Sequence, residues 1–306
     1  PIMVLRESAL SHNIRRMASY CKGLGVDLAP HVKTPMSPQI AKRQLDAGAW
    51  AITVASYSQA SVFLDFGFNR IIIGDEVLEP TSIQDIAKRN FSGKAEILFY
   101  VDSIAALNIV KVAIKDQSEA KINLLIEIGA SDGRAGLRDI SHLPEILEAI
   151  KSEPKISVRG VSGFEGAVPG GDRDAGVARI RSFLEKIVAA AAVVAPFVNG
   201  KVIISAGGSS YFDYVAQEFA KYKGDAHIIL RSGGYVSHDH VHYEELYPFM
   251  DAKVEDRFIP ALEIWSRALS VPESSLAILN FGKRDAGNDL DEPLPIKKFT
   301  GKIEEF

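Results

Sequence analysis

The stretch VDLAPHVKTPMSPQIAKRQLDAGAWAITVA, residues 26–55, contains the pattern that decides the fold. It begins with a short apolar segment, Val26–Pro30, continues through an amphipathic segment, Pro38–Leu45, and ends with a second apolar segment, Ala51–Ala55. Apolar segments of this length are too short for helices and are typical of strands, whereas the segment between them has helical periodicity. The stretch therefore predicts one unit of strand, helix and strand.

The same alternation continues to about residue 230. It predicts eight strands, at Val26–Pro30, Ala51–Ala55, Arg70–Gly74, Glu96–Val101, Ile122–Ile128, Val158–Gly163, Val202–Ser205 and His227–Leu230. Amphipathic segments between them predict helices, among them Pro38–Leu45, Ile104–Ile114, Leu143–Ile150, Asp174–Ala191 and Tyr211–Lys221. The strands are apolar almost throughout, without clean alternation, which indicates a parallel sheet that is covered on both faces.

Eight such units predict an α/β fold in which the sheet closes as a (β/α)8 barrel of the TIM type. The alternative is an open doubly wound sheet, which also alternates strand and helix. The count of eight favours the barrel, and no Gly-x-Gly-x-x-Gly motif follows the first strand. We expect the barrel over residues 8–243, with residues 1–7 and 244–306 in a smaller β-domain that is incomplete in this chain.

After about Tyr243 the rhythm changes. Three segments, Arg257–Pro260, Ala261–Leu269 and Ser275–Phe281, read as successive strands without helices between them. They predict the start of the smaller β-domain.

Composition limits the classes of partner. Nearly half of the residues, 47%, are apolar, 24% are charged, and the formal net charge is -4. This balance gives no electrostatic reason to expect nucleic acid or an anionic membrane as partner, and leaves a small metabolite open. The chain has no apolar run of about eighteen residues for a membrane span and no leader pattern in Pro1–Leu5. Its one cysteine, Cys21, fits a reducing compartment, so we expect a cytoplasmic protein.

In a barrel of this kind the active site lies at the carboxyl ends of the strands. Lys33 follows the first predicted strand and lies between Pro30 and Pro35, which stiffen the backbone. Partial burial there would lower the pKa of the amine and make it a usable nucleophile. Taken alone, a lysine at such a position is more often a surface cation, and His31 is more often a structural neighbour than a base.

Paired glycines follow the last two predicted strands. The first loop reads Ser205-Ala206-Gly207-Gly208-Ser209-Ser210, and the second reads Arg231-Ser232-Gly233-Gly234-Tyr235. Backbone amides in such loops can approach an anion closely, and the loops after strands seven and eight are the usual phosphate site of a barrel. Either glycine pair alone is weak support for this interpretation, but the two together at these positions favour phosphate binding.

Two charged residues follow the fifth and sixth predicted strands. Arg134 lies in the glycine-flanked loop Gly129–Gly136, where its guanidinium could pair with a phenolate oxygen or a substrate carboxylate. An arginine in a surface ion pair is an equally good interpretation. Glu165 brings a carboxylate near the same edge.

The run His238-Asp239-His240-Val241-His242 has the residue types of a metal site. In an extended segment Asp239 would face away from the three histidines. The sequence offers no other evident partner nearby, so a metal here is the weaker interpretation.

With Lys33 and the glycine loops in place, the chain resembles the alanine racemase-like, fold-type III family of pyridoxal-phosphate enzymes. Within this family it is most similar to the branch of D-serine dehydratase, D-amino-acid deaminase and D-threonine aldolase. The resemblance runs from Val4-Leu5-Arg6 through Phe281–Asp285. Its most specific parts are Pro30-His31-Val32-Lys33-Thr34 and Gln44-Leu45-Asp46-Ala47-Gly48-Ala49.

The resemblance implies that Lys33 holds pyridoxal 5'-phosphate as a Schiff base and later moves protons at the substrate α-carbon. It also implies that Gly207, Gly208, Ser209, Gly233 and Gly234 hold the phosphate, with Tyr235 beside it. Arg134 would face the ring of the cofactor.

The branch further implies a divalent metal, zinc or manganese, held by a His and a nearby Cys or Asp in a C-terminal motif. No such motif appears before Phe306. We expect it to lie beyond that residue, or this protein departs from the metal-dependent pattern.

The resemblance implies a lyase that acts on D-amino acids. We expect a D-serine dehydratase-like deaminase, which converts a β-hydroxy-D-amino acid to a keto acid and ammonia. The alternatives are a D-threonine-type aldolase, an amino acid racemase and a pyridoxal-phosphate carrier without turnover. Related enzymes are dimers, so we expect a homodimer.

Overall fold

The computed structural model describes residues 1–168, 173–241, 243, 247–287, 292–300 and 303–305. Its centre is a sheet of eight parallel strands in the order β2-β9-β8-β7-β6-β5-β4-β3. The strands are β2 (Asp27–Leu28), β3 (Ile52–Val54), β4 (Arg70–Glu76), β5 (Glu96–Val101), β6 (Ile122–Ile128), β7 (Ile156–Gly163), β8 (Val202–Ala206) and β9 (Ala226–Leu230). The predicted eight parallel strands are confirmed, each within a few residues of its predicted bounds.

The sheet closes between its first two strands. Just beyond β2, His31 forms an isolated parallel bridge with Thr53. The Thr53 N–H donates to Pro30 O at 2.9 Å, and the Val32 N–H donates to Thr53 O at 2.8 Å. These bonds join the two ends of the sheet, so the predicted barrel is confirmed and the open doubly wound sheet is excluded.

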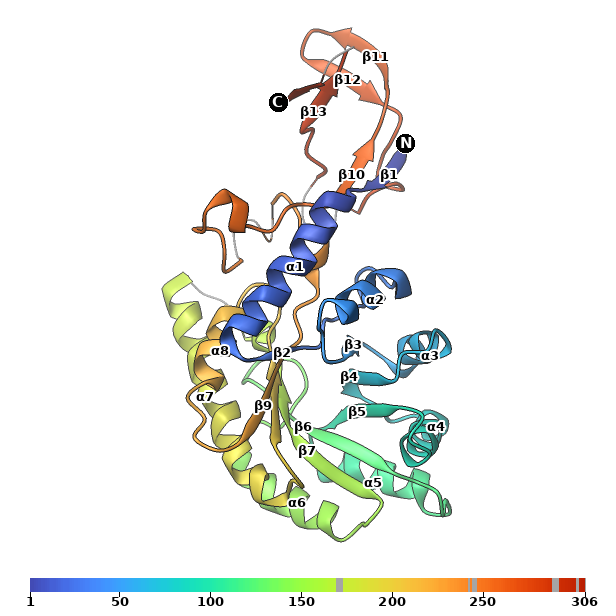
Figure 1. Cartoon of the computed structure of the whole chain (residues 1–306), viewed down its shortest axis with the longest axis vertical. Helices are drawn as coiled ribbons and strands as arrows, with labels where there is room; N and C mark the ends of the chain where they lie inside the picture. The colour runs from blue at the N-terminus through green and yellow to red at the C-terminus, as the bar shows by residue number, and fades with distance from the viewer. Residues whose placement is uncertain (169–172, 242, 244–246, 288–291, 301–302, 306) are drawn as a thin grey trace.

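Within the described part of the chain, eight α-helices surround the barrel (Figure 1). They are α1 (Glu7–Leu24), α2 (Pro38–Asp46), α3 (Tyr57–Asp65), α4 (Pro80–Phe91), α5 (Ile104–Ile114), α6 (Leu143–Lys151), α7 (Arg173–Val194) and α8 (Phe212–Phe219). Several begin at a serine whose hydroxyl accepts a backbone N–H of the first turn, as Ser37 does from Ile40 and Ser103 does from Ala106. Such caps satisfy donors that the helix cannot satisfy itself.

The barrel interior is layered, because side chains alternate between the two faces of each strand. The middle layer is apolar and consists of Ala29, Ala51, Ile72, Leu98, Leu125, Ile203 and Ile229, with Tyr100 above them. Two residues further along the strands the inward positions become polar. This upper layer contains His31, Thr53, Glu127, Ser162, Ser205 and Arg231. We call the carboxyl ends of the strands the mouth and the polar upper layer the polar floor. The polar floor lies between the mouth and the apolar middle layer.

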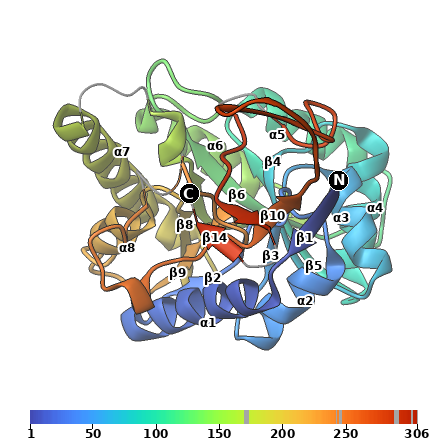
Figure 2. The same ribbon diagram turned by 90° about the horizontal axis from the view of Figure 1, so that it is seen from above.

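Three antiparallel ribbons accompany the barrel: β1 (Ile2–Leu5) with β10 (Leu262–Trp265), β11 (Ala268–Glu273) with β12 (Leu276–Leu279), and β13 (Lys297–Phe299) with β14 (Ile303–Glu305). They lie beyond the N-terminal end of α1, on the side of the mouth (Figures 1 and 2). The pairing of β1 with β10 joins the two ends of the chain that were expected to share a small β-domain. The domain boundaries themselves remain a prediction.

One predicted strand is wrong. Arg257–Pro260 is extended but forms no strand, because its partner is a side chain. The buried Asn13 of α1 accepts the Ile259 N–H and donates to Ile259 O, both at 2.8 Å. A second correction concerns Ala261–Leu269, which is split between β10 and β11 instead of forming one strand.

No helix among the described residues is long and apolar enough to cross a bilayer.

Candidate active site

Lys33 lies in the turn that follows β2, and its side chain is exposed at the mouth. The turn is anchored at its start by the backbone bonds of Pro30 and Val32 to Thr53, and the Met36 N–H donates to Val32 O at 2.9 Å across it. Partial burial of the amine, and then the positive charges of Arg134 and Arg231, lower the pKa of Lys33 below its ordinary value. A larger share of the amine is therefore neutral near neutral pH, which suits a nucleophile.

His31 lies half-buried beside this lysine. The Lys33 N–H points to His31 Nδ1 at 3.4 Å, which requires that ring nitrogen to be an acceptor. Burial, followed by the charge of Lys33, lowers the pKa of His31 to about 3. The ring is therefore neutral over the working pH range, in agreement with its interpretation as a structural neighbour.

Arg134 lies in the loop that follows β6, and its side chain is exposed. Its guanidinium carbon is 5.4 Å from the centre of the Phe164 ring, within cation–π range. No ion pair of Arg134 occurs among the described residues. The side chain is thus positioned by an aromatic face and keeps its hydrogen-bond donors for a ligand, and the surface ion pair considered from sequence does not form in the described structure.

The two glycine loops lie against each other and against the end of β2. A Cβ added to Gly233 would lie 2.0 Å from His31 O, and one added to Gly234 would lie 2.7 Å from Ser209 Oγ. The Gly234 N–H donates to Ser209 Oγ at 3.1 Å. These glycines therefore allow three strand ends to approach one another more closely than any side chain would permit.

The amides of the first glycine pair already have an acceptor. Glu165 is buried, and its carboxylate accepts the N–H groups of Gly207, at 3.0 Å, and of Gly208. In contrast, the N–H groups of Ser209, Ser210 and Gly233 have no acceptor among the described residues. The N–H groups that are available to an anion are thus those of Ser209 and Ser210 in the first loop and of Gly233 in the second, rather than those of Gly207 and Gly208.

Tyr235 is buried, and its hydroxyl accepts a hydrogen bond from Gln44 Nε2 at 2.7 Å. Its ring packs 5.5 Å from that of Phe258. The side chain is therefore part of the core, and only the main chain of Tyr235 adjoins the glycine loop. The contact also gives a structural reason for the glutamine in the motif that begins at Gln44.

Arg231 is a buried cation in the polar floor that the sequence reasoning missed. Its Nη2 donates to Gly163 O at 2.5 Å, its Nε donates to Ser205 Oγ at 3.1 Å, and its guanidinium carbon lies 5.8 Å from the centre of the Tyr100 ring. It follows β9 directly, two residues after the inward-facing Ile229. The alternation of inward positions was the signal that could have found it.

Two carboxyl groups in the same floor were also missed. Glu127 is buried, Glu76 at the end of β4 is half-buried, and one oxygen of each has no hydrogen-bond partner among the described residues. Burial and the neighbouring Glu127 raise the pKa of Glu76 to about 8, and burial also raises the pKa of Glu127. Two adjacent carboxyls that resist ionisation together retain a proton at neutral pH.

The histidine run does not form a metal centre in the described chain. His238 packs against the rings of Tyr247 and Phe258, and Asp239 Oδ1 accepts the N–H groups of Val241 and Tyr243. His242 lies outside the described residues. No group of three or more His, Cys, Asp or Glu residues that could hold a metal occurs among the residues that the structure describes.

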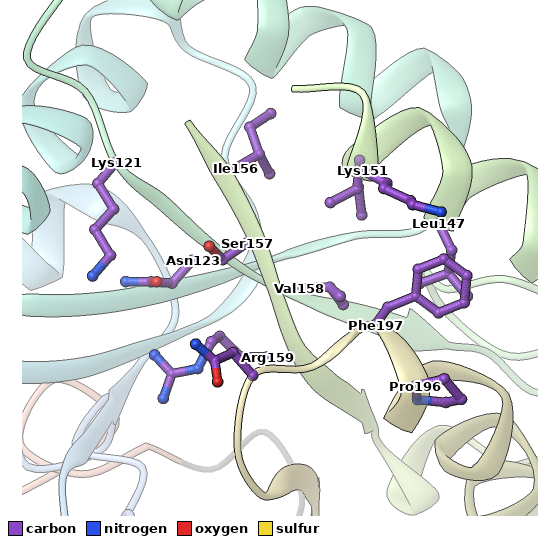
Figure 3. A pocket seen from close by; sticks show the side chains of 12 residues that line it. Lys121, Asn123, Leu147, Lys151, Ile156, Ser157, Val158, Arg159, Pro196 and Phe197 are labelled. Atoms are coloured by element: carbon purple, nitrogen blue, oxygen red, sulfur yellow. The ribbon is translucent and has the colours of Figure 1, made fainter. Parts of the chain in front are cut away.

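The opposite end of the barrel also has a hollow. A groove of about 760 Å³ lies at the amino ends of β6 and β7 and is lined by Lys121, Asn123, Lys151, Arg159 and Phe197, among others (Figure 3). The active sites of (β/α)8 barrels lie at the carboxyl ends of the strands, not at the amino ends. We therefore place the candidate active site at the mouth, where Lys33, Arg134 and the glycine loops meet.

Comparisons with known proteins agree with this architecture. The chain is 27% identical over 224 residues to 3-hydroxy-D-aspartate aldolase of Paracoccus denitrificans (strain Pd 1222), covering 70% of this chain and 56% of that protein. It is 31% identical over 137 residues to D-threo-3-hydroxyaspartate dehydratase of Delftia sp. (strain HT23), covering 45% of this chain and 35% of that protein. The chain spans about half the length of the relatives it matches.

Among solved structures, D-threonine aldolase from Filomicrobium marinum superimposes with a TM-score of 0.77 at 22% sequence identity, covering 96% of this chain and 76% of that one. At this identity the likeness concerns the fold. The family model for the alanine racemase N-terminal domain matches residues 5–212, which is more than half of the chain. The barrel, the relatives and this match together establish that the chain belongs to the alanine racemase N-terminal domain family.

Proposed function

We propose that the chain forms the cofactor-binding barrel of a pyridoxal-phosphate-dependent lyase that acts on β-hydroxy-D-amino acids. The observation that carries the proposal is that the mouth contains both the Lys33 amine and a glycine loop whose Ser209 and Ser210 N–H groups lack acceptors among the described residues. The names of the relatives support the substrate class, since they are aldolases and a dehydratase of D-amino acids with a 3-hydroxyl group.

The residues present fit the cofactor. Its aldehyde needs an amine of lowered pKa, which Lys33 provides. Its phosphate needs converging donors without crowding side chains. The N–H groups of Ser209, Ser210 and Gly233 supply these donors, and a Cβ at Gly233 would collide with the backbone of His31. When bound, the cofactor supplies an electron sink for the negative charge that develops at the substrate α-carbon.

Each residue then has a definite task. Ser209, Ser210 and Gly233 would hold the phosphate. Gly207, Gly208 and Gly234 would shape the two loops, since their amides are bound to Glu165 and to Ser209 Oγ. Arg134 would orient the substrate carboxylate or the phenolate oxygen of the cofactor with its fork of donors. Lys33 would hold the cofactor and, once displaced by substrate, take the proton from Cα.

Our first choice for the reaction is a dehydration. Lys33 Nζ removes the Cα proton, and the Cα–H electron pair forms a double bond to Cβ as the C–O bond breaks. The hydroxyl leaves with a proton as water. One water re-enters when the product hydrolyses, so the balanced products are one keto acid and one ammonium ion.

The second candidate is an aldolase, and the aldolase names among the relatives favour it. Here a base takes the proton of the β-hydroxyl, and the bond between Cα and Cβ breaks. The electron pair stays on Cα, which then receives a proton. The products are glycine and an aldehyde, so product analysis separates the two reactions.

The test uses the full-length protein loaded with pyridoxal phosphate. D-serine, D-threonine and their L-forms are added with and without a chelator, while ammonia, keto acid and aldehyde are assayed. Keto acid with ammonia from a D-form alone supports the dehydratase, and aldehyde with glycine supports the aldolase. Inversion of the α-carbon without breakdown would indicate a racemase, and bound cofactor without any turnover would indicate a carrier.

The role of Lys33 is tested with Lys33→Ala, and the matched control is Lys42→Ala, an exposed lysine on α2. After borohydride treatment, mass spectrometry of the wild-type protein should find the cofactor attached to Lys33, and Lys33→Ala should lose both this attachment and at least about 10³-fold in activity. Lys42→Ala should behave as wild type. A Lys33→Ala protein that keeps the borohydride-stable adduct would refute the proposal.

A further inference from the structure

The peptide groups of Gly207 and Gly208 are held from both sides by side chains of the two neighbouring strand ends. On one side Glu165, after β7, accepts both N–H groups. On the other side the Ser232 hydroxyl, after β9, lies 3.1 Å from Gly207 O and 2.9 Å from Gly208 O and shares its proton between them. We call Glu165 and Ser232 the loop clamp.

The loop clamp is buried. Glu165 and Ser232 are each 1% exposed. No Lys or Arg side chain forms an ion pair with Glu165 among the described residues, so its charge is offset by the two amide dipoles and, at longer range, by Arg231. Burial raises the pKa of Glu165, which the bonds to these amides oppose. A buried carboxyl group costs free energy that its hydrogen bonds must offset, and here the two glycine amides are the bonds that offset it.

The bonds that the clamp makes determine which way the loop faces. With the Gly207 and Gly208 N–H groups turned toward Glu165 and their carbonyls turned toward Ser232, the next amides, of Ser209 and Ser210, remain without acceptors among the described residues. Gly207 has a φ of +105°, a conformation that favours glycine. A Cβ at Gly208 would lie only 3.0 Å from Glu165 Oε1. The loop therefore has its shape before any ligand binds.

We propose that Glu165 and Ser232 are positioning residues that preset the glycine loop for a phosphate ester. This inference rests on the proposed function, because it takes the phosphate of pyridoxal phosphate as the ligand. Neither residue would touch the phosphate, since both are bonded to the peptide groups of Gly207 and Gly208. They act by removing the conformations in which the Ser209 and Ser210 amides point elsewhere, so the ligand meets donors that are already ordered.

A competing interpretation makes the opposite prediction. A carboxylate on the glycine amides could act as an internal anion that occupies part of the phosphate site and repels the phosphate. Removing its charge would then strengthen binding. The direction of the change in affinity therefore distinguishes the two interpretations.

The experiment compares the binding of pyridoxal phosphate with that of pyridoxal, which lacks the phosphate. Dissociation constants are measured by absorbance titration of the wild-type protein, Glu165→Gln and Ser232→Ala. In Glu165→Gln one glycine N–H would face the NH2 group of the glutamine instead of an acceptor. We expect the affinity for pyridoxal phosphate to fall about tenfold or more, while that for pyridoxal changes less than about twofold.

The matched control is Glu218→Gln. Glu218 is also 1% exposed, but it lies on α8 and pairs with Arg181 and Lys221. Its variant should keep the wild-type ratio of the two dissociation constants. If circular dichroism shows that Glu165→Gln does not fold, Ser232→Ala carries the test. In that variant we expect the preference for pyridoxal phosphate over pyridoxal, measured as the ratio of the two dissociation constants, to fall about threefold to fivefold.

The outcomes separate the inference from the proposed function. A wild-type protein that binds pyridoxal phosphate no better than pyridoxal refutes the proposed function and the inference with it. A wild-type preference that both clamp variants retain overturns the inference alone. Tighter binding of pyridoxal phosphate by Glu165→Gln also overturns it and identifies Glu165 as an internal competitor.

Discussion

At the scale of single residues, the mouth keeps His31 neutral and makes ionisation of Glu76 difficult. Both effects have the same main cause, since burial disfavours the charged form of either side chain. Burial lowers the pKa of the imidazole to about 3 and raises that of the carboxyl to about 8. Both side chains therefore stay neutral over a wider pH range in the folded protein than they would in the unfolded chain. Their contributions to the free energy of unfolding change with pH in opposite directions.

His31 should not titrate over the usual working range. Its folded pKa of about 3 lies below the ordinary value of 6.5, so the unfolded chain binds the extra proton first and stability falls as pH decreases from about 6.5 toward 3. We expect the ¹⁵N shifts of the His31 ring to stay constant from pH 8 to pH 4.5 in nuclear magnetic resonance spectra. A midpoint near pH 6.5 would contradict this prediction.

Glu76 should have the opposite effect. Its folded pKa of about 8 lies above the ordinary value of 4.5, so the folded chain retains the proton, and its contribution to stability is lost as pH rises from about 4.5 to 8. Glu76→Gln should remove this decline and raise the free energy of unfolding at pH 8 by about 1 kcal/mol, discounted for partial exposure. Urea denaturation at pH 5 and pH 8 measures the difference.

The control for this measurement is Glu79→Gln, a nearby carboxyl that is exposed. Its substitution should change stability equally little at both pH values. If Glu76→Gln destabilised the protein more at pH 8 than at pH 5, the carboxyl would have to be ionised in the folded state, and the shared proton would be ruled out.

At the scale of elements, the close contact between the loop after β9 and the end of β2 depends on one missing side chain. In Gly233→Ala the new Cβ would lie 2.0 Å from His31 O, so one of the two backbones must move. We expect a loss of about 2–3 kcal/mol in the free energy of unfolding, together with weaker cofactor binding. Chemical denaturation and cofactor titration measure the two effects.

Gly23→Ala is the matched control, because Gly23 lies in α1 and a Cβ there would meet nothing within 4 Å. It should be neutral or stabilising by about 0.5–1 kcal/mol, since alanine is the better helix former. Equal stability of Gly233→Ala and the wild-type protein would show that the two backbones are free to separate.

The strands and helices of the barrel could be predicted because their signal is local. Ile104–Ile114 has the bounds that its periodicity predicted, and Ile122–Ile128 reads as a buried strand. Arg257–Pro260 has the same local appearance, yet its hydrogen-bond partner is the side chain of Asn13, far away in the sequence. Local patterns do not reveal which partner an extended segment finds.

The candidate site was predicted where position alone decides and missed where pairing decides. Lys33, Arg134 and the glycine loops follow strands, so the rule that barrel sites lie at strand ends was enough to predict their position at the mouth. The roles of Glu165 and Ser232, and the contact between Glu76 and Glu127, depend on distances between neighbouring strands. Such distances appear only when the barrel closes.

At the scale of the whole molecule, the small ribbons expose apolar side chains. Trp265 is 57% exposed, Leu269 68% and Val271 64%. Exposed apolar surface of this kind marks a region that another surface covers. We propose that the protein is a homodimer, as the family resemblance implies, and that these ribbons contribute to its interface.

Sedimentation velocity tests this proposal. The wild-type protein should sediment as a dimer, and the double variant Leu269→Glu/Val271→Glu should shift it toward the monomer, because two charges would be buried in the interface. Val112→Glu is the control, since Val112 on α5 is 74% exposed and lies on the outside of the barrel. A monomeric wild-type protein would refute the dimer.

The loop clamp has a consequence for the order of folding. It joins the ends of β7, β8 and β9, and the loop after β9 also touches the end of β2, which is the first strand of the barrel in the chain. A nascent or partly folded chain that lacks any of these strands would lack part of the proposed phosphate site. Contacts between the two ends of a chain form slowly, because a long loop must close first. On the proposed function, cofactor binding would therefore follow closure of the barrel and would report it.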